Sequence, residues 1–419
     1  MGRVILGQGC YLEDGVGSTR PNDNQVLVGA SGSGKSMSSL LPTLLNLDSS
    51  LLAVYSKAGE ARKLATYLKA NGYQVQICDL AQPDRSDVSF DPLHYLCSFD
   101  DIKSQSAHII QSAVGMTRDE YWNRKAISLL GGLEAAVMMT RDDASFVDVL
   151  ELVDQCDVTE QRDGFSIPAD DFFDELKEMA PQSYASREIS KWRSLPFRTG
   201  SCVIDTMSAA LSETFPESTR ELMRRKDRVN FRQLAEEKRA LIIISSPVNT
   251  SLYFFANLMM YQGIKDLLEY AEECPGQRLP RPVKLAFDDF ACSAPIHKFS
   301  EYISIFRAAG ISAILCIQSE SQLRSLYGED QATTILNNCS AYVYFPGGMD
   351  LTTCRNVSAR YDLPLSDVLY APVGNVFVMQ SGQKPVIVPR YDTLHSPEYQ
   401  RYLKAQEKSP SRKRRQNTR

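Results

Sequence analysis

A glycine-rich run between residues 29 and 36 has the residue types and the spacing that bind phosphate groups. It fits the pattern G-x-x-x-x-G-K-[ST] and consists of Gly29, Ala30, Ser31, Gly32, Ser33, Gly34, Lys35 and Ser36. Glycines allow successive backbone N–H groups to point into one concavity, and the following helix presents its positive N-terminal end to the same phosphates. In such a P-loop the lysine reaches the β- and γ-phosphates and the hydroxyl ligates Mg²⁺. The run therefore predicts a site for a nucleoside triphosphate with Mg²⁺.

A pair of carboxylates supplies the second half of this chemistry. The apolar run 283–287 is followed directly by Asp288 and Asp289. The end of a parallel strand places Asp288 at the sheet edge beside the phosphates. We expect Asp288 to hold Mg²⁺, through water or together with Ser36, and Asp289 to orient or deprotonate the attacking water. A solvated acidic turn without a catalytic role is the alternative.

Two further polar residues are candidates on weaker grounds. Gln318 ends the next predicted strand, 312–317, where a group that contacts the γ-phosphate would lie. A strand-terminal glutamine is often only a cap, so both interpretations stay open. Arg307 lies on the intervening predicted helix, and its local sequence requires no function because most exposed arginines are simply solvated.

These residues need a framework of alternating strands and helices to meet at one edge. Apolar runs predict strands at 26–28, 51–55, 73–78, 240–245, 283–287, 312–317 and 341–345, with a hairpin over 375–389. Helical patterns lie between them, for example at 37–45, 59–70 and 252–272. This alternation predicts an α/β fold with a mostly parallel central sheet.

One long segment lacks the alternation. Candidate helices lie at 102–114, 119–139, 145–156, 172–179 and 186–211, without a convincing strand. We therefore expect an all-α domain at 98–236, inserted into a nucleotide-binding core formed by 1–97 and 237–395. Residues 1–25 are expected to form only a polar lead into the first strand. The segment 396–419 is expected to be a disordered, basic tail.

Composition excludes several classes of protein. The chain has 419 residues, 43% hydrophobic and 23% charged, with a net charge of −5, so a broadly basic nucleic-acid surface is not expected. Ten cysteines without a C-x-x-C pair indicate reduced thiols in a cytosolic compartment, and four scattered histidines do not predict a metal site built by the protein alone. No signal peptide and no uninterrupted apolar run of about 20 residues are evident.

Six motifs in order carry a resemblance that spans about residues 3–395. They are Gly29–Ser36, Lys57-Ala-Gly-Glu60, Phe90-Asp-Pro-Leu93, Phe287-Asp-Asp-Phe-Ala291, Ile317-Gln-Ser-Glu-Ser-Gln-Leu323 and Gly347-Gly-Met-Asp350. In these motifs the chain resembles the TraG/TraD-type coupling proteins of type IV secretion. The resemblance implies a RecA-like P-loop ATPase of the FtsK/HerA class. Such a protein hydrolyses ATP with Mg²⁺, acts as a hexamer, and brings DNA with its relaxase or relaxosome, or protein substrates, to a membrane-embedded secretion channel.

The resemblance also implies roles for single residues. Gln318 matches the family's glutamine after the sensor strand, and Arg307 matches an arginine that acts in trans on the neighbouring subunit. The segment 98–236 is similar to the all-α domain implicated in recognising the relaxosome or the secreted substrate.

Three departures from the family pattern limit what is carried over. The family usually has glutamate where this chain has Asp289, and the motif at Lys57 lacks its usual aspartate and proline. Family members usually carry two membrane helices before the P-loop. We expect either a trimmed chain or one that docks on a separate membrane partner, acting at the cytoplasmic face of the cell membrane. Whether the isolated chain is a hexamer or a monomer stays open.

The predicted function is ATP-driven coupling of DNA or protein substrates to a conjugation channel. One alternative is a nucleotide-binding adaptor that docks substrates with little hydrolysis, which Asp289 in place of glutamate favours. Another is an FtsK-like DNA translocase, although no winged-helix module is recognisable after the core.

Overall fold

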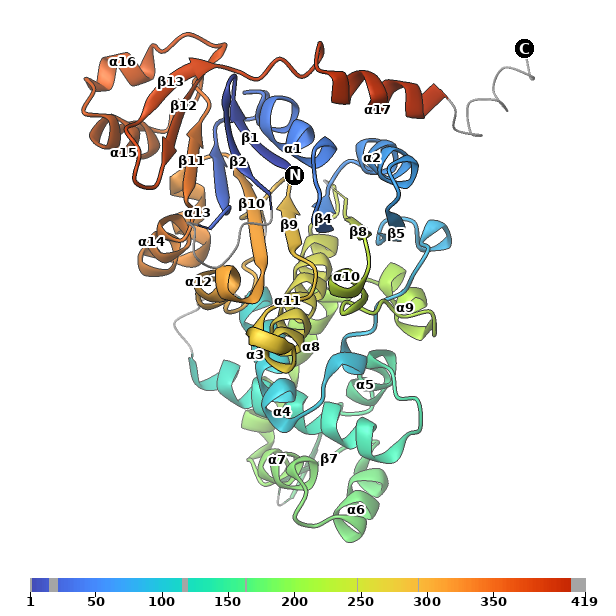
Figure 1. The fold of residues 1–419 in the computed structure, drawn as a ribbon. Coiled ribbons are helices and arrows are strands. Elements are labelled where there is room, and N and C mark those ends of the chain that lie inside the picture. The colour runs from blue at the N-terminus through green and yellow to red at the C-terminus, as the bar shows by residue number, and fades with distance from the viewer. Residues whose placement is uncertain are drawn as a thin grey trace, which may run out of the picture. The chain divides into compact units, whose positions relative to one another are not determined.

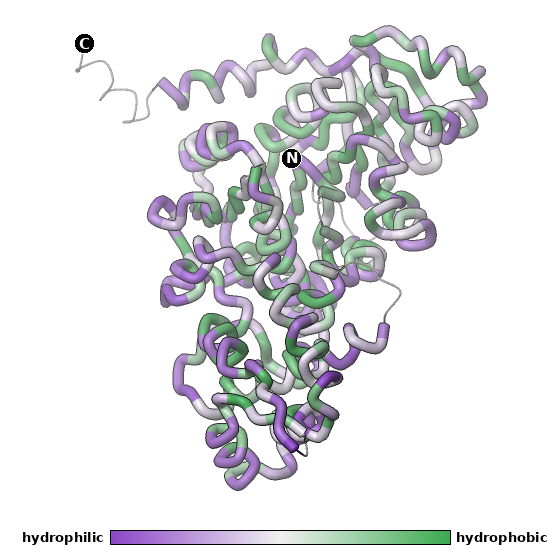
Figure 2. The backbone as a smooth tube through the Cα atoms, turned by 180° about the vertical axis from the view of Figure 1, so that it is seen from behind, coloured by the Kyte–Doolittle hydropathy of each residue, from purple (hydrophilic) through white to green (hydrophobic). Residues whose placement is uncertain are grey.

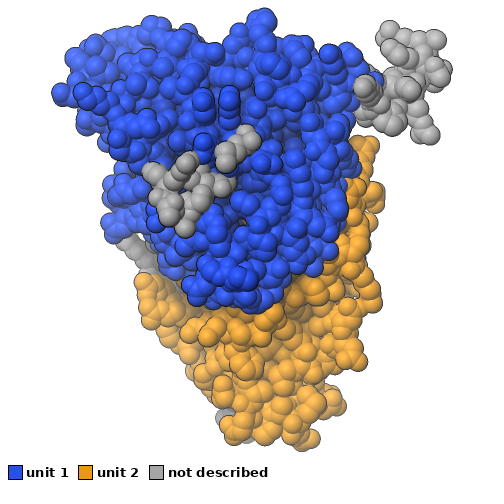
Figure 3. Space-filling view, viewed as in Figure 1, with its two compact units in different colours: residues 1–79, 230–248, 263–419 blue, residues 80–229, 249–262 orange. Residues whose placement is uncertain are grey.

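The computed structural model describes residues 2–14, 22–114, 120–162, 164–246, 248–292 and 294–407. The chain divides into two compact units, coloured separately in Figure 3. Unit 1 comprises residues 1–79, 230–248 and 263–419, and unit 2 comprises residues 80–229 and 249–262. The sequence-based boundaries of an inserted domain, 98 and 236, stay a prediction about domain organisation.

Unit 1 is built on a nine-stranded sheet with the strand order β13-β12-β11-β3-β10-β9-β4-β8-β5. The strands are β3 (Gln25–Val28), β4 (Ser50–Tyr55), β5 (Gln74–Asp79), β8 (Arg239–Ile244), β9 (Val283–Phe287), β10 (Ile311–Ile317), β11 (Ala341–Tyr344), β12 (Asn375–Gln380) and β13 (Val386–Pro389). The strands from β11 to β5 are parallel, whereas β12 and β13 pair antiparallel at one edge. Hydrophobic residues, green in Figure 2, are concentrated in these strands. The predicted α/β fold is confirmed.

Helices flank this sheet (Figure 1). They are η1 (Ser36–Leu40), α1 (Leu41–Leu45), α2 (Ala58–Ala70), α10 (Gln233–Glu236), η4 (Pro275–Gln277), α12 (Phe299–Ala309), α13 (Glu320–Tyr327), α14 (Glu329–Asn337), α15 (Leu351–Tyr361), α16 (Leu365–Leu369) and α17 (Pro397–Glu407). Leu44 of α1 and Leu64 of α2 share one buried cluster with Leu51 of β4. Burial of such a side chain contributes about 1.5–3 kcal/mol, so this cluster anchors the elements around the P-loop.

The N-terminal residues form a hairpin where the sequence suggested only a polar lead. Its strands are β1 (Arg3–Gly7) and β2 (Cys10–Glu13), paired antiparallel. Val4 and Leu6 are fully buried in the same cluster as α1, and Ile5 N donates to Thr43 Oγ1 at 2.8 Å. The expectation was wrong because the hairpin depends on contacts with the helix after the P-loop, which local sequence does not show.

The segment expected to be a disordered tail begins with a helix. Residues Pro397–Glu407 form α17, and Tyr402 is 7% exposed, with its ring 5.9 Å from that of Tyr67 on α2. Gln406 Nε2 also donates to Lys63 O at 2.8 Å. The prediction was therefore wrong for 397–407, since tertiary packing orders a polar segment. The basic residues of 408–419 lie outside the described residues.

Unit 2 is mainly helical. Its elements are η2 (Pro83–Arg85), η3 (Pro92–Tyr95), α3 (Phe99–Val114), α4 (Glu120–Thr140), α5 (Phe146–Val153), β6 (Thr159–Gln161), β7 (Gly164–Ser166), α6 (Asp170–Met179), α7 (Tyr184–Arg193), α8 (Phe197–Thr214) and α9 (Glu217–Arg224). Helix α11 (Thr250–Glu273) begins in unit 2 and ends in unit 1.

Two details of unit 2 correct the sequence-based expectation. The short hairpin of β6 and β7 interrupts a segment in which no strand was expected. The single helix expected at 186–211 is two helices, α7 and α8, because Pro196 stands between them as the N-cap of α8. Proline has no N–H to donate and disfavours a helical residue before it, so the first helix ends and a second one starts.

A buried glutamate in unit 2 predicts a pH-dependent stability. Glu134 on α4 is fully buried, and Gln105 Nε2 and Ser106 Oγ donate to its carboxyl at 3.4 and 3.2 Å. Burial raises the pKa of Glu134 from 4.5 to about 8. The folded state therefore keeps a proton that the unfolded chain releases, so this contribution to stability is complete below about pH 4.5 and is lost as the pH rises toward 8.

We expect Glu134→Gln to remove this pH dependence. Relative to the unsubstituted protein, the variant should gain a few kcal/mol of unfolding free energy between pH 5 and pH 8.5, since one pKa unit corresponds to about 1.36 kcal/mol. Denaturant unfolding of the full chain at several pH values measures this difference. Glu178→Gln, at an exposed position of α6, is the matched control. Parallel pH profiles for Glu134→Gln and the unsubstituted protein would contradict the assignment.

Among the residues that the structure describes, no helix is both long enough and apolar enough to cross a membrane.

Candidate nucleotide-binding site

The predicted P-loop joins β3 to η1 in unit 1. Gly32 and Gly34 have φ values of +74° and +96°, in the left-handed region that favours glycine. At Gly29 a Cβ atom would lie 2.7 Å from Ser33 Oγ and 2.8 Å from the carbonyl oxygen of Phe345. Three glycines of the motif are thus required by backbone shape or by close packing.

The helix after the loop starts with a wide turn. It begins at Ser36 as the π-helix η1 and continues as α1, whereas the sequence predicted a helix over 37–45. Leu41 N donates to Ser36 O across the wide turn, and Pro42 follows in the first turn of α1. Proline has no N–H and cannot donate the next α-helical hydrogen bond. This accounts for the wider hydrogen-bonding pattern of the first turn.

Lys35 lies inside the loop. Its Nζ donates to Gly29 O, and to Ala30 O at 3.1 Å, and the residue is 9% exposed. Burial lowers the pKa of Lys35, and the negative charges of Asp289 and Asp288 partly oppose this effect. The lysine is therefore held at the cradle by two carbonyl groups, partners that phosphate oxygens can replace.

The two carboxylates after β9 reach the loop from the neighbouring part of the sheet. Ser36 Oγ donates to Asp288 Oδ1 at 2.6 Å, and Asp288 is 7% exposed. Asp289 accepts a hydrogen bond from Ser56 Oγ at 3.1 Å. Burial, and then the charge of Asp288, raise the pKa of Asp289. The structure thus brings together the predicted magnesium ligands and places the predicted water-orienting carboxylate next to them.

Gln318 lies at the same sheet edge. It follows β10, which runs between β3 and β9, and Ile317 is paired in register with Val28, the last residue before Gly29. Its backbone N donates to Gln322 Oε1 at 3.3 Å, and its side chain is exposed. The position fits a residue that faces the terminal phosphate.

A buried carboxylate that the sequence analysis gave no role fixes the backbone beside Gln318. Glu320 is fully buried at the start of α13. It accepts from Tyr342 OH at 2.9 Å and from Asn356 Nδ2 at 2.7 Å, and it pairs with Arg360 at 2.5 Å. Arg324 also contacts Glu320, at 3.4 Å. Glu320 therefore binds four side chains, which come from β11, α13 and α15. These contacts anchor the start of α13, two residues after Gln318.

Arg307 does not join this group. It is exposed in the last turn of α12, directly before β10 begins. Strand β3 is parallel to β10. The P-loop follows the C-terminal end of β3, whereas Arg307 precedes the N-terminal end of β10. With a rise of about 3.3 Å per residue, the length of β10 separates the two by roughly 20 Å. Arg307 therefore lies near the opposite sheet edge from the P-loop of its own chain.

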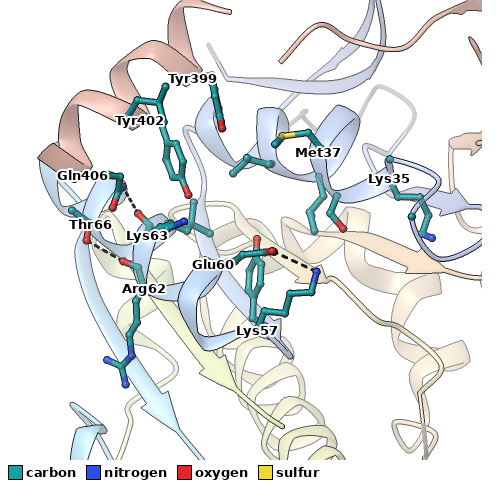
Figure 4. Close-up of a pocket in the computed structure, with 18 of the residues that line it drawn as sticks. Lys35, Met37, Lys57, Glu60, Arg62, Lys63, Thr66, Tyr399, Tyr402 and Gln406 are labelled. Carbon is teal, nitrogen blue, oxygen red and sulfur yellow. Dashed lines mark hydrogen bonds and ion pairs between the residues drawn. The ribbon is translucent and has the colours of Figure 1, made fainter. Parts of the chain in front are cut away.

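A cavity of about 850 Å³ opens beside the P-loop within unit 1 (Figure 4). Residues 32–37 line one side, α2 another and α17 a third. Lys57 and Glu60 form an ion pair at 3.4 Å in its wall, and Tyr399 and Tyr402 extend from α17 toward it. The volume lies within the range of small-molecule and cofactor sites.

Two contacts in the site were missed for different reasons. Ser56 has a local signal, since it follows β4 at the sheet edge that also carries Asp288. For Glu320 the only signal in the sequence was its place in a motif, because its partners on β11 and α15 are remote in sequence.

Comparison with known proteins identifies the family. Residues 6–359 match the family model described as type IV secretory system conjugative DNA transfer. No curated protein matches the chain.

Solved structures share the fold at low sequence identity. The unbound bacterial conjugative coupling protein TrwBdeltaN70 has a TM-score of 0.71 and 15% identity, covering 95% of this chain and 90% of that chain. The plasmid coupling protein TrwB in complex with ADP and Mg²⁺ has a TM-score of 0.70 and 15% identity, with coverage of 94% and 93%. VirB4 of Thermoanaerobacter pseudethanolicus has a TM-score of 0.53 and 12% identity, with coverage of 95% and 98%. On the strength of the family match over most of its length, the chain belongs to the type IV secretory system conjugative DNA transfer family.

Proposed function

We propose that this chain is an ATPase that couples ATP hydrolysis to conjugative DNA transfer. It would recruit DNA with its relaxase or relaxosome, or protein substrates, to a type IV secretion channel at the cytoplasmic face of the membrane. The observation that carries the proposal is the 2.6 Å hydrogen bond from Ser36 Oγ to Asp288 Oδ1, which joins the end of the P-loop to the carboxylate after β9. The family match supports a role in DNA transfer. The TrwB complexes with ADP and Mg²⁺ and with ADPNP support a nucleotide ligand.

The donor set fits ATP with magnesium. The Ser36 hydroxyl and the Asp288 carboxylate are the oxygen ligands that Mg²⁺ prefers. When bound, Mg²⁺ neutralises charge on the β- and γ-phosphates. Lys35 exchanges Gly29 O and Ala30 O for phosphate oxygens, and the loop N–H groups bind the remaining ones.

The other residues act on the attacking water and the terminal phosphate. Asp289 orients the water and accepts its proton. Gln318 hydrogen-bonds the γ-phosphate from the end of β10. Because Arg307 lies at the far sheet edge of its own chain, it completes the site of a neighbouring copy, and the active form is a homo-oligomer, a hexamer.

The adaptor alternative has one observation in its favour. Ser56 Oγ directs the carboxylate of Asp289 toward the end of β4, and aspartate is one methylene shorter than the glutamate usual in the family. A displacement of about 1 Å is enough to slow a reaction by about a hundredfold. Such a protein would bind nucleotide and substrate yet hydrolyse ATP very slowly.

A subunit-mixing assay tests the proposed function against this alternative. Phosphate release is measured against protein concentration, with and without DNA, for the unsubstituted chain, Arg307→Ala, Lys35→Ala and an equal mixture of the two variants. We expect a rate per subunit that rises with concentration and with DNA. Each variant alone should be inactive, and the mixture should recover activity because an intact P-loop then meets an intact arginine. A rate that is flat in concentration and DNA supports the adaptor, and a mixture no better than its components contradicts action in trans.

A further inference from the structure

The arginine that follows the last strand of the sheet lies against the P-loop. Arg390 follows directly after β13. A Cβ atom on Gly34 would be 2.9 Å from Nη1 of Arg390 and 3.4 Å from its Cζ. Because Gly34 has no side chain, the guanidinium lies directly beside the loop to which the proposed function assigns phosphate binding.

The chain around Arg390 is fixed on both sides. Its backbone N donates to Gly374 O at 2.8 Å. Three residues later, Thr393 is 2% exposed and its Oγ1 donates to Met37 O at 2.5 Å, on the helix after the P-loop. The segment 390–393 is therefore attached to the first turn of that helix, which limits how far the guanidinium can move from Gly34.

The charge of Arg390 has no counter-charge among the residues that the structure describes. Its Nε and Nη2 are buried and have no hydrogen-bond partner, and within the described part of the chain no carboxylate forms an ion pair with it. Its Cζ lies 5.9 Å from the centroid of the Phe345 ring. Burial lowers the pKa of Arg390.

Donors of this kind can bind an acceptor that a ligand supplies. A buried charged donor without an acceptor is destabilising, by more than a neutral donor would be. Guanidinium carries its donors in a fixed planar fork, whose geometry matches the oxygens of a phosphate group.

We propose that Arg390 is a nucleotide-binding residue whose guanidinium donates hydrogen bonds to oxygens of the nucleotide's phosphate chain beside Gly34. This inference deepens the proposed function and rests on it. The phosphates would then be bound by two cationic side chains, Lys35 of the P-loop and Arg390 of the segment after β13. The nucleotide thereby links the segment after β13 to the P-loop.

The test compares phosphate ligands in the full chain. Affinities for ADP with Mg²⁺ and for pyrophosphate with Mg²⁺ are measured by calorimetry for the unsubstituted protein and for Arg390→Gln. We expect both affinities to fall by about tenfold to a hundredfold, the range for hydrogen bonds to charged groups. A weaker affinity for ADP with an unchanged affinity for pyrophosphate would overturn the inference, because the contact would then be with the nucleoside.

Controls separate a binding role from a structural one. Without ligand, Arg390→Gln should unfold at the same temperature as the unsubstituted protein or higher, since it removes a partly buried charge that forms no ion pair within the described residues. A lower unfolding temperature with unchanged affinities would make Arg390 a structural residue. Arg390→Lys should retain part of the affinity, and Arg355→Gln, exposed on α15, should retain all of it. If the unsubstituted protein binds neither ligand, the proposed function itself fails, whereas normal binding by Arg390→Gln overturns this inference alone.

Discussion

Replacing Lys35 with alanine is expected to reduce ATP hydrolysis at least about a hundredfold while the protein stays folded. The amine is the only group of the P-loop motif with a full positive charge, and loss of one charged donor to developing charge costs this much or more in comparable sites. Within the described part of the chain, Lys35 Nζ donates hydrogen bonds to Gly29 O and Ala30 O. Its loss therefore removes two hydrogen bonds, each of about 1 kcal/mol, together with the contacts of one largely buried side chain.

Phosphate release at saturating ATP, together with thermal unfolding of the same preparation, measures the two effects separately. Lys69→Ala is the matched control, since Lys69 is exposed in the last turn of α2. Unchanged hydrolysis by Lys35→Ala in a preparation free of contaminating ATPases would refute the assignment of the site.

The largest effect on stability is expected from Lys284. This residue lies in β9 and is fully buried. Its Nζ pairs with Asp23, and with Asp14 Oδ1 at 3.4 Å. Burial disfavours the charged lysine, but the two carboxylates outweigh it and raise its pKa. Lys284→Met leaves two buried carboxylates without their cation, so we expect a loss of about 3–5 kcal/mol.

Denaturant unfolding, followed by a probe in unit 1, measures this loss. The control is the triple substitution Lys284→Met, Asp14→Asn and Asp23→Asn, which removes all three charges and should recover much of the stability. If Lys284→Met is as stable as the unsubstituted chain, the ion pairs of Lys284 do not contribute to the free energy of unfolding, and the prediction is wrong. If the triple variant is no better than the single one, packing rather than charge is responsible.

Features encoded within a few residues could be predicted from the sequence. Apolar runs such as those of β4 and β10 mark buried parallel strands, because such strands are covered on both faces of the sheet. The P-loop motif and the carboxylates after β9 were found for the same reason, since strand ends at one sheet edge bring Ser36 and Asp288 together. The family resemblance, stated from ordered motifs, is confirmed over residues 6–359.

Features that depend on remote partners could not be predicted. Helix α17 is polar, and it is ordered by the contacts of Tyr402 and Gln406 with α2. Glu320 and Lys284 are charged residues within or next to buried elements, and a single sequence does not show the carboxylates, arginines or tyrosines that bind them. Arg390 has the weakest local signal, because its position beside Gly34 arises only when the last strand joins the sheet.

The position of β13 at the side of the sheet affects whether copies of this protein can aggregate by strand pairing. It is the last strand at one side of the nine-stranded sheet, and Val386 and Ile387 are 42% and 48% exposed. An apolar edge strand is a template on which another chain can add a strand. Here the strand is four residues long, with Pro385 before it and Pro389 as its last residue. Proline has no backbone N–H to offer a partner strand, so the two prolines limit uncontrolled growth of the sheet.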